Sequence, residues 1–126
     1  MITLNTVDLI HSLNTLFQEA ISEVFYLENT RTEEIYPYLV FSYAIYSDQI
    51  YKKNIEIDVE VFDDKKLGYE RSELITSKLI KLIDDRTLEL EKSTTLVQLD
   101  SIILEHEKRT QTDFRKKSVK IKGRIN

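Results

Sequence analysis

Two segments in which apolar and charged residues alternate constrain the fold of this chain more than any other feature. Residues 54–61 read NIEIDVEV, and residues 119–125 read VKIKGRI. Because side chains of an extended chain point alternately to opposite faces, each segment predicts a half-buried β-strand with charge of one sign on its outer face. The acidic row consists of Glu56, Asp58 and Glu60, and the basic row consists of Lys120, Lys122 and Arg124.

An amphipathic helix is expected ahead of the acidic strand. Apolar residues recur at three- and four-residue steps from Val7 to Val24, which is the spacing of one helical face. Asn5 or Thr6 is expected to cap its first free N–H groups. A second amphipathic helix is expected after the acidic strand, ending at about Asp85.

The remaining strands follow from apolar runs. Residues 38–46 are apolar on both faces, which predicts a strand that is buried on both sides and pairs with the acidic strand in an antiparallel hairpin. Residues 47–53 would form the connecting loop. Ile50 and Tyr51 at its tip are apolar where loop tips are usually polar, so we expect them to contact a neighbour.

The C-terminal third is expected to contain further strands. Residues 86–95 show no clear period, and residues 96–107 alternate until the phase slips by one residue, as at a β-bulge. Residues 108–113 are expected to turn into the basic strand. The order of helix, hairpin, helix and strands predicts an α+β fold, in which an antiparallel or mixed sheet carries two main helices on one face.

Composition narrows the functional classes. A chain of 126 residues is expected to form one domain, residues 1–126. No apolar run approaches the about 20 residues that span a bilayer, and no secretory signal is visible, so we expect a protein that stays in the cell where it is made, with no membrane partner. The chain has no cysteine, which excludes disulfides and thiolate metal sites. A net charge of −4 argues against a dedicated nucleic-acid-binding protein.

Two metal-site interpretations are weaker than their structural alternatives. Asp58, Glu60 and Lys66 resemble the carboxylate pair and lysine of a metal-dependent nuclease, but the lysine follows the strand in a predicted turn. A solvated or interface row is therefore favoured. His106 lies between two glutamates, which on a strand would point away from it, so a surface histidine is favoured over a metal ligand. We expect no catalytic residues, metal or cofactor.

The aromatic residues and the charged rows each allow two interpretations. Five aromatic side chains beside a basic strand could stack single-stranded bases, but packing in the core and at an interface is favoured. The acidic and basic rows could be neighbours in one sheet, or each could meet its complement on another copy and form head-to-tail contacts. The sequence leaves both arrangements of the rows open. The five aromatic residues are Tyr36, Tyr38, Phe41, Tyr43 and Tyr46.

The arrangement of these segments resembles that of the small tail-terminator and tail-completion (head–tail joining) proteins of long-tailed phages. Four parts that together span nearly the whole chain carry the resemblance. They are the amphipathic helix around Leu13, Phe17 and Ile21, the segment 36–41 that enters the first long strand, the acidic strand 55–62 that leads into a helix, and the closing charged hairpin 102–125.

The resemblance implies an α+β protein of the virion, assembled in the cytoplasm of a bacterial host. Such a protein forms a hexameric ring at the head-proximal end of the tail tube, stops polymerisation of the major tail tube protein, and docks the head–tail connector protein. Other neck components share related folds and remain an alternative. The family has no catalytic residues to transfer to this chain.

We expect contacts between copies to use Ile50, Tyr51 and the two charged rows. An acidic lining formed by the acidic row would let DNA pass through the ring without specific binding, because like charges repel. Two other classes stay open as alternatives. One is the metal-dependent nuclease, and the other is a nucleic-acid-binding accessory protein that uses Lys120, Lys122 and Arg124.

Overall fold

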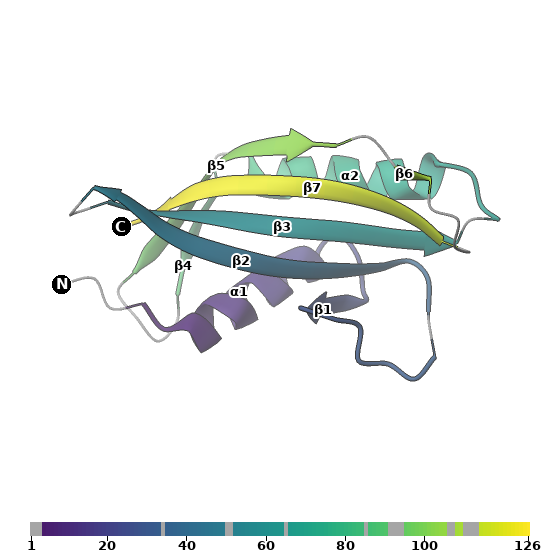
Figure 1. Ribbon diagram of the computed structural model, residues 1–126, viewed down its shortest axis with the longest axis horizontal. Helices are drawn as coiled ribbons and strands as arrows, with labels where there is room; N and C mark the ends of the chain where they lie inside the picture. The colour runs from purple at the N-terminus through teal and green to yellow at the C-terminus, as the bar shows by residue number, and fades with distance from the viewer. Residues whose placement is uncertain are drawn as a thin grey trace.

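The protein folds into a curled mixed β-sheet with two helices on one face (Figure 1). The computed structural model describes residues 4–33, 35–49, 52–64, 66–84, 86–90, 95–105, 108–109 and 114–126. This architecture confirms the predicted α+β class. The elements are α1 (Thr6–Gln18), β1 (Val24–Tyr26), β2 (Tyr38–Gln49), β3 (Lys52–Asp64), α2 (Glu70–Ile83), β4 (Arg86–Glu89), β5 (Leu96–Leu104), β6 (Lys108–Arg109) and β7 (Phe114–Ile125).

The strand order places the last strand of the sequence in the middle of the sheet. The order is β1-β2-β3-β7-β5-β4, and β6 adds a short pair to β7. β1 and β2 are parallel, and the other neighbours are antiparallel, including the predicted hairpin of β2 and β3. The pairing of β3 with β7 runs from Lys53 opposite Ile125 to Asp64 opposite Phe114. The two charged segments that dominate the sequence are therefore adjacent strands.

The core lies between one face of the sheet and the two helices. Every second residue of the long strands points into it, as the alternation predicts. The α1 side chain Phe17 packs edge-on against Phe41 of β2, with ring centroids 5.3 Å apart. Side chains with almost no solvent exposure come from both helices and four strands: Leu9, Leu13, Phe17, Leu39, Phe41, Ile55, Ile57, Leu79, Leu99 and Ile121.

A buried ion pair fixes the start of α2 against the end of β3. The Asp63 side chain is completely buried and accepts two hydrogen bonds from the Arg71 guanidinium, with Nε 3.0 Å from Oδ2. The hydrogen bond to Asp63 is the main reason why the pKa of Arg71 is raised above its usual value. Beside it, Lys117 Nζ of β7 lies 3.3 Å from Glu73 of α2. A buried carboxylate needs such a partner, so these pairs set where the helix meets the sheet.

The opening helix is shorter than its apolar period predicts. Asn5 caps it, since its Oδ1 accepts a hydrogen bond of 3.1 Å from the Asp8 N–H, as expected. The prediction that its apolar face continues to Val24 is wrong, because α1 ends at Gln18 and Val24 begins β1. Val24 pairs with Leu39 of β2 in parallel strands, so the backbone N–H and C=O groups of this segment bond to β2 instead of within a longer helix.

The N-terminal strands also differ from the prediction in extent and burial. β2 is not buried on both sides, because Ala44 and Tyr46 are exposed on the face away from the helices. The expected loop at 47–53 is mostly strand, since β2 continues to Gln49 and β3 begins at Lys52. Ile50 and Tyr51, which we expect at the tip, lie outside the described residues.

The C-terminal strands confirm one prediction and add two elements. The phase slip in the segment 96–107 is a register shift between Leu99 and Ser101 of β5, as expected for a bulge. β4 lies within 86–95, where the sequence shows no period, because only Leu88 among its four residues is buried. The predicted turn at 108–113 contains β6, which pairs with β7. β7 itself begins at Phe114, earlier than its alternation indicates.

Gly123 allows three strands to approach closely beside this bulge. It lies in β7 between Ile55 of β3 and Leu99 of β5. A Cβ atom at this position would overlap the backbone carbonyl oxygen of Gln98 and press on the Ile55 side chain. Gly68 precedes α2, and a Cβ atom there would meet nothing within 4 Å.

We expect Gly123→Ala to lower the free energy of unfolding by more than about 2 kcal/mol, because a backbone atom must move to relieve the overlap. The matched variant Gly68→Ala is expected to gain about 0.4 to 1 kcal/mol, since alanine restricts the unfolded chain and Gly68 has no positive φ. Urea denaturation of both variants checks this. Equal stabilities would contradict the close approach of β5 and β7.

Candidate assembly surface

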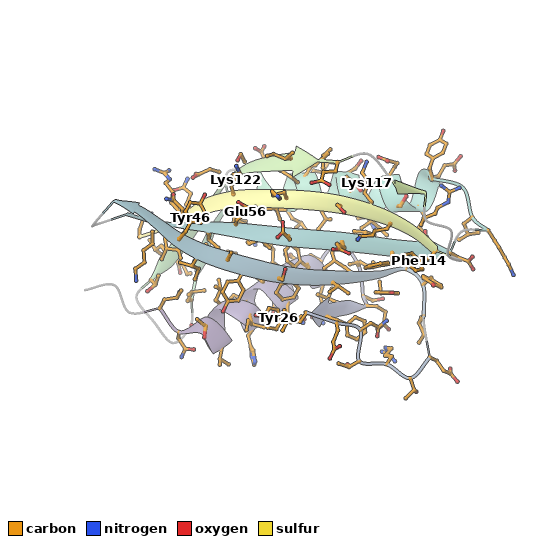
Figure 2. The ribbon with its side chains drawn as sticks, viewed as in Figure 1. Tyr26, Tyr46, Glu56, Phe114, Lys117 and Lys122 are labelled. Atoms are coloured by element: carbon orange, nitrogen blue, oxygen red, sulfur yellow. The ribbon has the colours of Figure 1, made fainter. Side chains whose placement is uncertain are left out.

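The sheet face opposite the helices carries the acidic and basic rows side by side. In the register of β3 and β7, Glu56 lies opposite Lys122 and Asp58 lies opposite Lys120. Lys120 Nζ is 3.2 Å from Glu56 Oε1 and 3.9 Å from Asp58 Oδ1. Figure 2 shows Glu56 and Lys122 towards one end of this open face. Of the two arrangements that the sequence leaves open, the structure has the rows as paired neighbours in one sheet.

The charged ladder extends beyond the predicted rows at both ends. Lys116 Nζ lies 3.0 Å from Glu60, so the outward basic residues of β7 begin before Lys120. At the other end, Arg124 Nε lies 2.9 Å from Asp100, the residue at the β5 bulge. The bulge therefore places a carboxylate beside the last arginine of the basic row.

This pairing neutralises most of the open face. The hydrogen bond to Glu56 is the main reason why the pKa of Lys120 is raised above its usual value, and the negative charges of Glu56 and Asp58 add to it. Lys122 is exposed and has no ion pair among the described residues, while Asp58 retains 55% of its side-chain exposure. Paired opposite charges cancel at a distance, so neither row forms a single-sign surface for binding or repelling DNA.

Aromatic side chains cross four neighbouring strands at the other end of the open face. Ring centroids are 6.2 Å apart between Phe25 and Tyr38, 4.8 Å between Tyr38 and Phe62, and 5.3 Å between Phe62 and Phe114. Tyr36 stacks on Tyr38 at 5.7 Å. We call these five residues the aromatic row. Phe114 marks its end on β7 in Figure 2.

The aromatic row differs from the aromatic cluster that the sequence suggests. Phe41 and Tyr43 belong to the core side of β2, and Tyr46 lies apart at the far end of the open face. Phe25, Phe62 and Phe114 were missed because they lie on three other strands. Phe62 continues the alternating segment at an outward-facing position, so the sequence itself indicates that its ring lies on the open face. Only the register of the sheet brings the three rings together.

A hollow of about 250 Å³ lies next to the aromatic row. Asp58, Glu60 and Phe62 contribute one wall, and the segment 27–29 after β1 contributes the other. Leu27 has a φ of 71°, and the Glu28 N–H donates to the Tyr26 carbonyl across it at 2.9 Å, which forms a strained γ-turn. The volume is below the about 300 to 1,000 Å³ of sites that bind drug-sized ligands.

The residues considered for a nuclease do not form a metal centre here. Asp58 and Glu60 share the open face, but each has a lysine of β7 beside it. Lys66 lies in the turn after β3, where its N–H donates to Asp64. Across the described ranges, no group of three or more histidine, aspartate or glutamate side chains is placed to hold a metal ion. His106 lies outside those ranges.

Comparison with solved structures identifies a similar fold in one chain of a structure described as the virion of a native gene transfer agent (GTA) particle. The TM-score is 0.60 and the sequence identity 14%, and the match covers 86% of this chain and 83% of that chain. No protein-family model and no curated protein matches the sequence. At this identity the likeness establishes a shared fold over most of both chains. No helix in the described residues is long and apolar enough to cross a membrane.

The ion pairs of the charged ladder predict that reversing one charge lowers the stability of the fold, and that reversing its partner as well restores part of it. Glu56→Lys places a third lysine beside Lys120 and Lys122, and like charges on adjacent strands destabilise a sheet. We expect a lower midpoint of urea denaturation for this variant. Adding Lys120→Glu should recover part of the loss, because it restores an opposite-charge pair. A double variant that is no more stable than Glu56→Lys would contradict the pairing.

Proposed function

We propose that this protein is a structural component of a phage or prophage virion, and specifically a tail terminator. In this role it forms a ring at the head-proximal end of the tail tube, stops polymerisation of the major tail tube protein and docks the head–tail connector protein. The fold likeness to a virion chain over 86% of the sequence carries the proposal. The charged segments and the closing hairpin support it through their resemblance to tail terminators.

The open face is suited to contact with another protein. The aromatic row supplies large side chains of the kind that are enriched at the centres of interfaces, and the charged ladder supplies a polar surround. The small hollow beside Phe62 fits a single protruding side chain better than a metabolite. We propose that this face meets the tail tube protein or the connector protein.

The interface residues expected from the sequence stay part of the proposed contact, but those that form ion pairs within the chain are placed at its edge. Glu56, Glu60, Lys120 and Arg124 are paired within the chain, so we propose that they form the polar rim of the contact. Asp58 and Lys122 retain the exposure needed to meet charges of a partner. Ile50 and Tyr51 remain proposed contacts between copies in a hexameric ring. DNA passes through this ring without specific binding.

A tube-elongation assay tests the terminator role directly. Purified protein is added to the polymerising major tail tube protein, and tube lengths are measured by negative-stain electron microscopy. We expect tubes to stop growing at a length set by the ratio of the two proteins, with a ring at one end. Tubes of unchanged length would contradict the terminator role. Binding to the connector protein alone would favour another neck component.

The same assay tests the aromatic row. Phe114→Ala removes an end residue of the row and is expected to raise the concentration needed for capping at least about tenfold, as aromatic anchors at interface centres often do. Tyr69→Ala removes an exposed aromatic ring just before α2, away from the open face, and is expected to cap normally. Thermal denaturation verifies that both variants are folded. Normal capping by Phe114→Ala would exclude this row from the contact.

A further inference from the structure

The sheet has two unlike free edges. β4 is the last strand at one end of the strand order. At the other end, β1 pairs only with Leu39–Phe41 of β2, so the rest of β2 has no neighbour on that side among the described residues. Unpaired N–H and C=O groups along a strand edge are a template for pairing with another chain.

The hydrogen bonds of β5 show which groups of β4 face outwards. Leu96 exchanges both backbone hydrogen bonds with Asn126, so Leu96 and Gln98 bond towards β7, and Val97 and Leu99 bond towards β4. The β4 residues opposite Val97 and Leu99 are Leu88 and Arg86. By alternation, Thr87 and Glu89 point their N–H and C=O groups away from the sheet.

The same reasoning applies to β2. Leu39 donates its N–H to Glu23, and Phe41 accepts from the Leu27 N–H, so odd-numbered residues of β2 bond towards the β1 side. Beyond β1, Tyr43 and Ile45 therefore present their backbone groups to the free edge. The segment 42–46 contains no proline and no charged residue. It lacks the features with which proteins usually protect an edge strand.

The free edge of β4 borders a groove. Residues of α1, of its two caps and of β4 line a hollow of about 620 Å³, among them His11, Leu16 and Leu88. Asp8 and Glu19 also line the groove, and Glu89 lies at its β4 edge. The only described cation in the lining is Arg86, 3.9 Å from Glu19. The groove therefore offers outward backbone groups on one side and an excess of acidic side chains.

We propose that the free edge of β2 in one copy pairs with the free edge of β4 in the next copy, so that the sheet continues from subunit to subunit. This inference rests on the proposed ring and names its subunit contact. The two edges are unlike and lie at opposite ends of one sheet, and contacts of this head-to-tail kind close into rings when the rotation permits. The β2–β3 hairpin carries exposed Lys53 near its end, which complements the acidic groove of the neighbour.

The pairing places particular side chains next to each other. Phe41 and Leu88 point into the core, so by alternation Ala44 and the β4 residues Thr87 and Glu89 lie on the open face. All three are exposed in the single chain. The outward backbone groups belong to core-facing residues on β2 but to open-face residues on β4, so only parallel pairing of the two edges keeps the open faces of both copies on one side. In such a continuous sheet, Ala44 of one copy is expected beside Thr87 or Glu89 of the next, on strands about 4.7 to 4.9 Å apart.

Engineered cysteines test this arrangement, because the chain has no cysteine of its own. Ala44→Cys protein is mixed with Thr87→Cys protein, and separately with Glu89→Cys protein, under mild oxidation at a concentration where light scattering gives the mass of the assembly. We expect a disulfide-linked heterodimer in at least one mixture, at several times the yield of either homodimer. Ser77→Cys, exposed on α2, is the matched control. It should form no heterodimer when it replaces Thr87→Cys or Glu89→Cys in the mixture with Ala44→Cys.

Each outcome decides the edge pairing separately from the terminator role. A homodimer of Ala44→Cys as the main product would show a symmetric contact between β2 edges and overturn the proposal. Assemblies without the heterodimer, or a strict monomer without it, would also overturn it. The tube-elongation assay judges the terminator role independently of all these results.

A proline variant tests the edge pairing a second time, without cysteine chemistry. Thr87→Pro removes an outward N–H group of β4, and by the derived alternation this group is not used within the chain. We expect it to weaken self-association about tenfold while thermal denaturation stays close to that of the wild type. Unchanged self-association of a folded Thr87→Pro protein would overturn the pairing.

Discussion

The pairing of β3 with β7 is the interaction on which the rest of the structure depends. It joins the two segments whose alternation dominates the sequence, and it does so along nearly their whole length. On one face, their apolar residues form the sheet side of the core and pack beneath both helices. On the other side, their charged residues form the ladder of ion pairs. Since a slip of one residue would bury the charges and expose the core, the alternation itself holds the register.

The sequence contains enough information for the α+β class, the hairpin, the second helix and the β5 bulge, because each follows from a local period. It contains less about short elements. β4 buries a single leucine, and β1 follows apolar residues that also fit a helical period, so local patterns do not identify either strand. Their existence depends on backbone pairing with β2 and β5, and such pairing overrides local preference.

The candidate surface shows the same division between local and distant information. The charged rows are readable as rows, but whether Lys120 meets Glu56 of its own chain or of another is a question of strand order. Phe25, Phe62 and Phe114 are unremarkable in the sequence, and only the order β1-β2-β3-β7 brings their rings to one end of the sheet. In the same way, the free edges of β2 and β4 follow from what their neighbours leave uncovered.

The central place of β7 also has a consequence for biosynthesis. The strands on both sides of it, β3 and β5, are made earlier by the ribosome and cannot pair with each other in the native order. The growing chain therefore holds two separate parts of the sheet, each with an edge that β7 will later cover. Joining them needs contacts across a large part of the sequence, which slows folding and prolongs the exposure of those edges. Molecular chaperones would have their greatest effect on this protein in the interval before β7 emerges.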